Sequence, residues 1–275
     1  MPKQKETQVV EVAIMERGSF SCNIVGTSPM LCNAMSAKVR MELLAPKGRK
    51  TTAEKQATIK HDPIAEFRRS AYRTKDENAP TYIYHPAAAW KKAIANTAVD
   101  IAGVARAQIE RLCWIEGRDI PLFGIPQLHM GVVRNSDMNR TPDIRTRVCL
   151  PEWASQISVT FMKPNLTEKS LITLLANAGM INGMGDWRQQ KGGPFGHFKI
   201  VPEDDPTFRR IVETGGREAQ LEALENPTAF DLESEELLEA YFAEMTARGR
   251  EAQVTKAEPS TNGRKQRASK ELAGV

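Results

Sequence analysis

Glycine is concentrated in one short stretch of this chain, and that stretch constrains the fold more than any other feature of the sequence. Residues 183–198, GMGDWRQQKGGPFGHF, hold five of the 18 glycines in 16 residues. Glycine adopts positive φ angles and lets a ligand or another backbone approach closely. A predicted helix over 167–177 and an apolar run over 179–181 precede this glycine loop, and a predicted strand over 195–201 follows it. We therefore expect a unit of helix, strand, long loop and strand.

The order of these elements excludes two common phosphate-binding loops. A Walker-type loop needs G-x-x-x-x-G-K-[ST] at the start of a helix, and the chain contains no such string. A dinucleotide-binding fingerprint needs G-x-G-x-x-G between a strand and a helix, whereas a predicted strand follows this loop. The glycine loop therefore belongs to neither class.

Side chains between the glycines favour a polyanionic ligand. The loop contains two cations, Arg188 and Lys191, and three aromatic residues, Trp187, Phe195 and Phe198. Cations suit a phosphate backbone, and exposed aromatic rings stack on unpaired bases. The alternative is a flexible hairpin connection at a sheet edge that binds nothing, and the residue types alone leave both interpretations open.

Formal charge is distributed unevenly along the chain. The whole chain carries +4, residues 203–250 carry 13 acidic and 5 basic side chains, and residues 1–202 carry about +10. A basic body followed by an acidic segment suggests a polyanionic partner. Ordinary solubility charge, with no partner, is the alternative.

Two further basic segments extend the predicted polyanion surface. Residues 45–60 are interpreted as a surface loop that either grips nucleic acid or is a solvated insertion. Residues 131–147 contain four arginines together with Asn, Asp and Pro, which predict a long loop between strands. An ordinary basic hairpin loop is the alternative for this segment. The candidate contact residues of the two segments are Lys47, Arg49, Lys50, Arg134, Arg140, Arg145 and Arg147.

The remaining sequence predicts strands and helices mixed along the chain, which is typical of an α+β protein. Helices are expected over 34–44, 64–72, 87–99, 104–112 and 231–246. Strand structure is expected over 8–25, 81–84, 113–134 and 155–162. Asp62 and Pro63 are a typical helix start. Residues 8–25 form either a hairpin that turns at residues 17–19 or one long bent strand.

The organisation expected from these patterns is a body followed by an extension and a tail. The body covers 1–202, an acidic helical extension covers 203–250, and a disordered tail covers 251–275. The helix over 231–246 is amphipathic, with Leu232, Leu237 and Phe242 among its apolar residues, so we expect it to dock on the body or on a neighbouring subunit.

Cysteine use and hydropathy predict a cytoplasmic protein. The four cysteines, Cys22, Cys32, Cys113 and Cys149, are scattered without a C-x-x-C pair, which favours unpaired thiols in a reducing compartment. No run approaches 18 apolar residues, and the polar N-terminus lacks the apolar core of a signal peptide.

Histidines and carboxylates form no recognisable catalytic or metal-binding motif. The four histidines, His61, His85, His129 and His197, include no pair such as H-E-x-x-H, and Asp186 is a lone carboxylate in the glycine loop. A nucleophile, a positioned base and a stabilising group do not occur together. We therefore expect no metal, no cofactor and no catalysis. The alternative is a metal-independent endoribonuclease that uses His197 or His61.

The glycine loop resembles the signature loop of the RAMP superfamily of CRISPR-associated proteins. This resemblance rests on Gly183, Gly185, Gly193, Gly196 and Phe198. It implies a ferredoxin-like (RNA-recognition-like) fold, and the most similar type is the repeated backbone subunit that coats guide RNA. Membership of a CRISPR complex is not implied, because no repeat-associated partner motif is present.

Residues 9–201 also resemble a family of largely uncharacterised proteins of tailed phages and prophages. The matching strings are GTSPMLCNAMS (26–36), HDPIAEFRRSAY (61–72), HPAAAWKKAI (85–94), DIRTRVCLPEW (143–153) and the glycine loop. Together the two resemblances imply a RAMP-like nucleic-acid binder encoded by a phage or prophage, and acting in the host-cell cytoplasm.

These observations predict an α+β protein with a ferredoxin-like core, inserted basic loops and a C-terminal helical extension. We expect a non-enzymatic subunit that binds single-stranded nucleic acid without strong sequence preference, RNA favoured over DNA, and that forms a homo-oligomer able to assemble along the strand. Arg188 and Lys191 would contact phosphates, and Trp187 would stack on a base or buttress the loop. His197 and the four matched glycines complete the expected contact set. Apart from the endoribonuclease, the alternative is a phage structural or assembly protein whose glycine loop only joins subunits.

Overall fold

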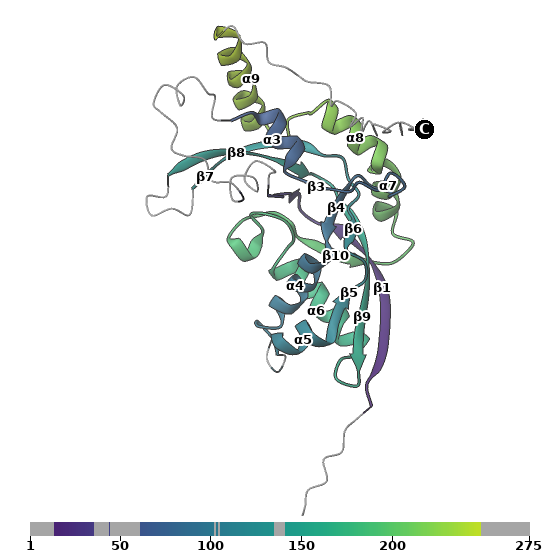
Figure 1. Ribbon diagram of the computed structural model, residues 1–275. Helices are drawn as coiled ribbons and strands as arrows, with labels where there is room; N and C mark the ends of the chain where they lie inside the picture. The colour runs from purple at the N-terminus through teal and green to yellow at the C-terminus, as the bar shows by residue number, and fades with distance from the viewer. Residues whose placement is uncertain are drawn as a thin grey trace, which may run out of the picture.

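A computed structural model of the protein describes residues 14–35, 44, 61–101, 103, 105–134 and 141–248. Within these residues the chain forms seven α-helices and three antiparallel β-sheets (Figure 1). The expected α+β class is therefore confirmed. Most of the predicted helix over 34–44, the loop over 45–60 and the tail over 251–275 lie outside the described residues.

The central sheet holds four strands in the order β10-β1-β9-β5, each antiparallel to its neighbours. The strands are β1 (Glu16–Gly26), β5 (Cys113–Ile115), β9 (Ala154–Lys163) and β10 (Phe198–Val201). Polar and apolar residues alternate along β1, as in a strand with one buried face. Gly18 pairs with Phe161 inside the β1-β9 ladder, so the hairpin turn at 17–19, one of the two alternatives, is wrong. Residues 16–26 form one continuous strand, and residues 8–13 lie outside the described residues.

Two helices pack against one face of this sheet, and a third lies beside the first of them (Figure 1). They are α4 (Ala87–Thr97), α6 (Glu168–Ile181) and α5 (Arg106–Leu112). Thr167 caps the first turn of α6, as its place before the apolar repeat predicts. The helix continues through 179–181, where we expected a strand, because its end is fixed to α4: Asn182 Nδ2 donates to Ala93 O and to Thr97 Oγ1. The segment is therefore a helix, a long loop and a strand.

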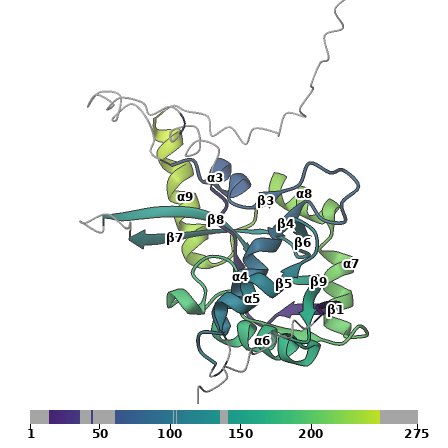
Figure 2. The ribbon, with the colours of Figure 1, turned by 60° about the horizontal axis from the view of Figure 1, so that its bottom comes forward.

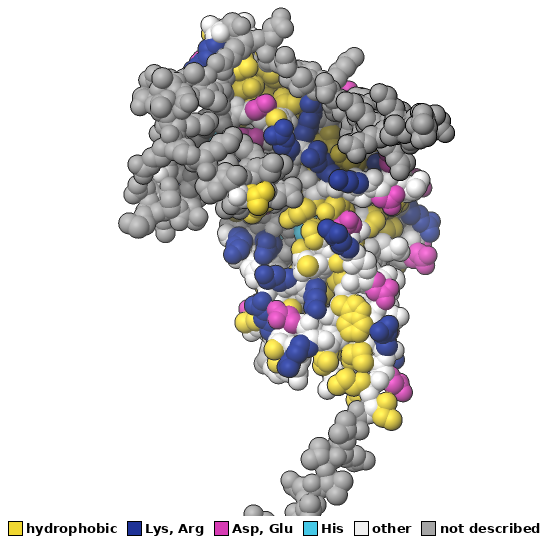
Figure 3. All heavy atoms as spheres, viewed as in Figure 1, with side chains coloured by type: hydrophobic (Ala, Val, Ile, Leu, Met, Phe, Trp, Pro, Cys, Tyr) yellow, Lys and Arg dark blue, Asp and Glu magenta, His cyan; other side chains and the backbone are white. Residues whose placement is uncertain are grey.

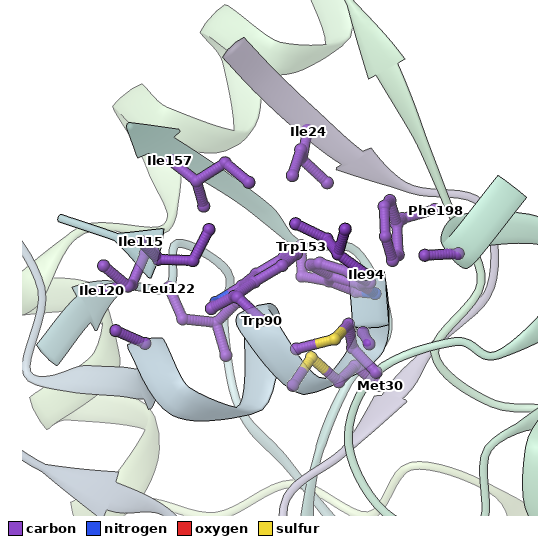
Figure 4. Packing of buried hydrophobic residues seen from close by; sticks show 14 of the residues in the cluster. Ile24, Met30, Trp90, Ile94, Ile115, Ile120, Leu122, Trp153, Ile157 and Phe198 are labelled. Carbon is purple, nitrogen blue, oxygen red and sulfur yellow. The ribbon is translucent and has the colours of Figure 1, made fainter. Parts of the chain in front are cut away.

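The main hydrophobic core lies between the central sheet and these helices. Figure 4 shows Trp90, Trp153 and Phe198 gathered in this core. The ring centroids are 5.6 Å apart for Trp90 and Phe198, 6.1 Å for Trp153 and Phe198, and 6.4 Å for the two tryptophans. All three side chains are buried, and full burial of a large apolar side chain stabilises a fold by about 1.5–3 kcal/mol. Because Phe198 is the last residue of the glycine loop, the core fixes that end of the loop.

Two three-stranded sheets have the orders β2-β8-β7 and β3-β4-β6. Their strands are β2 (Met30–Leu31), β3 (Tyr72–Arg73), β4 (Ile83–Pro86), β6 (Asp119–Pro121), β7 (Gln127–Arg134) and β8 (Pro142–Leu150). Helix α3 (Pro63–Arg69) packs on β8 and begins where the sequence predicts, because Asp62 Oδ1 accepts a hydrogen bond from Ala65 N at 3.0 Å.

The β7-β8 hairpin extends away from the core (Figure 1, Figure 2). We expected a long loop over 131–147, but strand pairing covers most of this range. Pairs such as Val132 with Ile144 join β-branched residues, which suit a pleated surface. Three predicted contact residues therefore lie on strands and not in a loop: Arg134, Arg145 and Arg147.

The helices that follow β10 pack on the rest of the fold. They are α7 (Pro206–Thr214), α8 (Arg217–Glu225) and α9 (Leu232–Ala247). Ile211 of α7 packs against Val25 and Val201 of the central sheet. Gln220 of α8 is fully buried, and its side chain forms hydrogen bonds with five backbone groups between Tyr82 and Gly215.

Helix α9 docks on β7, which confirms the expected contact of this helix with the body. Asp231 caps its first turn, and Ser234 Oγ accepts a hydrogen bond from Met130 N at 2.9 Å. Leu237 and Phe242 pack against the core, as expected for the apolar face. Leu232 was expected on the same face, but its side chain is exposed because it lies on the solvent side of the first turn.

The four cysteines are unpaired, and three of them are buried, in agreement with the expectation of free thiols. Burial raises the pKa of Cys22 and of Cys32 to about 12. None of the helices in the described ranges is long and apolar enough to cross a membrane.

Candidate nucleic-acid interface

A groove of about 1040 Å³ separates the glycine loop from the β7-β8 hairpin. Five of its lining residues are basic and one is acidic. The basic residues come from two separate segments of the sequence, residues 131–147 and the glycine loop. Figure 3 shows Lys and Arg side chains on the surface around the glycine loop. The lining residues are Asn33, Val132, Val133, Arg134, Arg145, Arg147, Asp186, Trp187, Arg188 and Lys191.

Glycines shape the loop by letting its backbone fold on itself. Gly196 has a φ of +80°, and a Cβ at this position would lie 1.8 Å from Met184 O. A Cβ on Gly193 would lie equally close to Trp187 O, at 1.8 Å. The matched glycines therefore determine the shape of the loop, and they do not line the groove: Gly183, Gly185, Gly193 and Gly196.

Backbone hydrogen bonds attach the loop to the segment that carries β2. Asp186 N donates to Leu31 O at 2.8 Å, and Gly196 N donates to Pro29 O at 2.7 Å. His197 takes part through its backbone, because its N donates to Ser28 Oγ at 2.9 Å. His197 lies outside the groove lining, so the structure does not bring it together with the cations.

Trp187 presents half of its side chain to the groove. The residue is 47% exposed. Its φ is +43°, and among the described residues no other non-glycine residue has a positive φ. One face of its ring contacts Phe195, with centroids 5.6 Å apart. Phe195 continues a row of rings through His129 to Phe230, at 5.8 and 5.9 Å. The tryptophan is therefore supported from behind and still accessible in front.

Arg188 and Lys191 stand in the loop wall of the groove. Arg188 Nη1 donates to Gly185 O at 3.0 Å and its Nη2 donates to Gln190 Oε1 at 2.9 Å, so the guanidinium also braces the loop. The Lys191 side chain is exposed, at the end of the 3-10 helix η1 (Gln189–Lys191). Within the part of the chain that the structure describes, neither cation forms an ion pair.

The floor of the groove holds an ion pair between a buried arginine and a partly exposed carboxylate. Arg147 is only 5% exposed, and its Nη1 lies 2.8 Å from Asp186 Oδ2. The same oxygen accepts a hydrogen bond from Asn33 Nδ2 at 2.9 Å. A buried guanidinium needs such a counter-charge, since an unpaired buried charge is strongly unfavourable. Sequence reasoning missed Asn33 and named Asp186 only as a lone carboxylate, because their relation to Arg147 exists only in the folded chain.

His129 lies behind this floor, paired with Arg147 across the hairpin. Burial and the charge of Arg147 lower the pKa of His129, although Asp231 acts in the opposite direction. His129 Nε2 is 4.0 Å from Asp231 Oδ2 at the start of α9. The histidine is therefore a mostly buried contact between the hairpin, α9 and the glycine loop.

The remaining histidines lie away from the groove lining. His61 is held between two carboxylates: Nδ1 lies 2.9 Å from Glu66 Oε1, and Nε2 lies 2.9 Å from Asp143 Oδ1. His85 is buried in the core, where desolvation lowers its pKa to about 4. No group of three or more His, Cys, Asp or Glu side chains suited to a metal ion occurs in the described ranges.

Four predicted contact residues fall in stretches that the structure leaves undescribed: Lys47, Arg49, Lys50 and Arg140. The other predicted cations meet in one groove with Trp187. No protein-family model matches the chain, and no curated protein is significantly similar to it.

Proposed function

We propose that this protein is a non-enzymatic subunit that binds single-stranded nucleic acid, RNA in preference to DNA, in the groove between the glycine loop and the β7-β8 hairpin. The observation that carries the proposal is the arrangement of Arg134, Arg145 and Lys191 around the half-exposed ring of Trp187. Cations on two walls can track a phosphate backbone, and the ring can stack on a base.

A single strand suits this groove better than a duplex. Stacking on Trp187 requires a base that is unpaired, and a paired base keeps its faces inside the helix. The preference for RNA over DNA rests on the resemblance to the RAMP superfamily, because an unpaired base can stack in either kind of single strand. Neutralisation of phosphates by the cations makes binding dependent on salt and tolerant of sequence.

A ferredoxin-like core is part of the proposal, and the order of elements supports it. Along the chain β1, α4, β5, β9, α6 and β10 follow the β-α-β-β-α-β order of that fold. In the sheet β9 separates β1 from β5, and β1 separates β9 from β10, which is the split β-α-β arrangement. The glycine loop precedes the last strand of this core, a placement that fits membership of the RAMP superfamily in a phage or prophage form. Assembly as a homo-oligomer along the strand belongs to the same proposal.

The histidine contacts favour a binding protein over an endoribonuclease. Both ring nitrogens of His61 are engaged by carboxylates, so neither is left to take a proton from a ribose hydroxyl. His197 makes its described hydrogen bonds through its backbone, outside the groove lining. A general base must lie within hydrogen-bond reach of the proton it removes.

Fluorescence anisotropy tests the proposal. The protein is titrated into labelled oligouridine RNA, oligothymidine DNA or duplex RNA, each about 12 units long, at several salt concentrations. We expect RNA to bind most tightly and the duplex least. Lys191→Ala should weaken binding and lower the slope of log affinity against log salt by about 0.7. Lys169→Ala, which removes an exposed lysine of α6, is the matched control. Absence of binding at low salt, or an equal effect of the two substitutions, would contradict the proposal.

A further inference from the structure

We infer that the floor of the groove reads one unpaired base through Asn33 and Asp186, and that guanine is the base it prefers. The inference rests on the proposed function, and it adds a specific position to a track that is otherwise tolerant of sequence. It begins from one unexpected feature, a partly exposed carboxylate among five basic residues.

The hydrogen bonds at the floor leave two acceptor oxygens without a partner among the described residues. Asp186 Oδ2 accepts from Arg147 Nη1 at 2.8 Å and from Asn33 Nδ2 at 2.9 Å. These bonds use one N–H of the Asn33 amide and one oxygen of the carboxylate. Among the residues that the structure describes, no hydrogen bond reaches Asp186 Oδ1 or Asn33 Oδ1. Since the Asp186 side chain is 35% exposed and Asn33 is exposed, a ligand in the groove meets two neighbouring acceptors.

Two acceptors, one of them charged, select what can bind beside them. A phosphate is repelled by the Asp186 carboxylate, so phosphates are directed to the cations of the walls. The group at the floor must instead donate hydrogen bonds, and the base edges of the nucleic acid supply such donors. The neighbouring Trp187 places a stacking surface next to the same position.

Guanine matches two acceptors better than the other bases do. Its Watson–Crick edge offers two adjacent donors, the N1–H and the N2 amino group. Adenine and cytosine each offer a single amino group there, and uracil offers one N–H. Only an unpaired base can present this edge to a protein, in agreement with binding of a single strand. A second hydrogen bond of this kind typically changes affinity about tenfold or more.

Changes in the ligand test the inference without changing the protein. Four oligouridine RNAs would carry uridine, guanosine, inosine or adenosine at one central position, and inosine lacks only the N2 amino group of guanosine. We expect guanosine to bind about tenfold more tightly than uridine, with inosine and adenosine between them. Equal affinity for all four would overturn the inference and leave the proposed function standing. No binding of any of them would instead refute the proposed function.

Substitutions in the protein assign the preference to these two side chains. Asn33→Leu removes one acceptor and leaves the Arg147–Asp186 pair in place, so the ratio of guanosine to uridine affinity within this variant should lose most of its tenfold value. Gln189→Leu makes a similar exchange at an exposed amide of the glycine loop, outside the groove lining. It should change neither the guanosine preference nor the affinity for oligouridine. Asp186→Asn, checked for folding by its melting curve, should also abolish the preference. An unchanged preference in Asn33→Leu, or equally tighter binding of all four RNAs by Asp186→Asn, would overturn the inference.

Discussion

The two walls of the groove are built in different ways. The glycine loop depends on contacts between backbones, since its buried glycines pack against the carbonyl groups of Met184 and Trp187. The β7-β8 hairpin depends on cross-strand pairs and on α9, which contacts β7 through Ser234. In the loop a change of backbone shape should therefore be more damaging than a change of charge, whereas the hairpin should accept side-chain changes on its exposed face.

The walls meet in the row of rings from Trp187 through Phe195 and His129 to Phe230. This row connects the loop, the hairpin and the start of α9. It explains how a loop with no regular strand can keep a fixed position opposite the hairpin. The comparison thus predicts three kinds of effect: on the shape of the loop, on the contact between the walls, and on the charge of each wall.

Gly196→Ala should have the largest effect, because it attacks the shape of the loop. The residue has a φ of +80°, and the new Cβ would overlap Met184 O. Backbone strain and overpacking together should lower the free energy of unfolding by about 3–5 kcal/mol, measured by urea denaturation. Gly192→Ala is the matched control: its φ is +77° but nothing lies within 4 Å of a Cβ there, so only about 1 kcal/mol should be lost. Equal losses in the two variants would show that the contact with Met184 is unimportant.

Acid should weaken the fold through histidines that are buried in the neutral form. His85 has a pKa of about 4, below its ordinary value, so the unfolded chain takes up its proton first as the pH falls. Stability is therefore lost from about pH 6.5 down to pH 4, by up to about 3 kcal/mol. The pKa of His129 is lowered in the same direction.

Urea denaturation at pH 7 and pH 5 measures this effect. His85→Leu should reduce the loss of stability between the two pH values, and His129→Leu should reduce it as well, because each removes a group that gains a proton on unfolding. RNA binding distinguishes the two variants. His129 contacts Phe195, so its replacement should also weaken RNA binding at pH 7, whereas the His85 ring is buried against Tyr72 and Trp90. A pH dependence that both variants retain in full would refute this account.

Phe230→Ala should loosen the contact between the walls. The half-buried ring packs against His129 and the cluster around Phe195, so its loss should lower stability by about 2 kcal/mol. It should also weaken RNA binding, because Phe195 supports Trp187. Phe208→Ala removes a similarly half-buried ring from the cluster beside α7 and should lower stability without affecting binding. Melting curves and anisotropy titrations on both variants separate the two outcomes.

Local signals in the sequence predicted the elements whose determinants lie close together in the chain. Asp62 and Pro63 mark the start of α3 because capping acts over three residues. The strand expected over 179–181 was wrong because a short apolar run suits a strand or a helix, and the deciding contact, from Asn182 to Thr97, is distant in sequence. The loop expected over 131–147 was drawn too long, because strand pairing reaches Arg134 on one side and begins at Pro142 on the other.

The groove itself could not be derived from the sequence. Its cations were recognised as two separate segments, and their meeting depends on how the glycine loop folds over β2. Arg147 illustrates the limit, because it is one of four arginines in a basic segment, and only the fold shows that it is buried and paired with Asp186. Asn33 carried no signal of its own beyond its place after the apolar residues of β2.

The smallest expected effects come from single charges, and they test whether both walls contact the same strand. Arg134→Gln removes a charge from the hairpin wall, and Lys191→Gln removes one from the loop wall. Because both side chains are exposed, neither variant should change the melting temperature by more than about a degree. Each should lower the slope of log affinity against log salt by about 0.7, and the double variant by about 1.4, because each cation releases its own counterion from the strand. Arg188→Gln should differ from both: its guanidinium also bonds Gly185 O, so some stability should be lost together with affinity. A slope that responds to Lys191 and not to Arg134 would mean that the strand follows the glycine loop alone, and that the hairpin serves only to hold that loop in place.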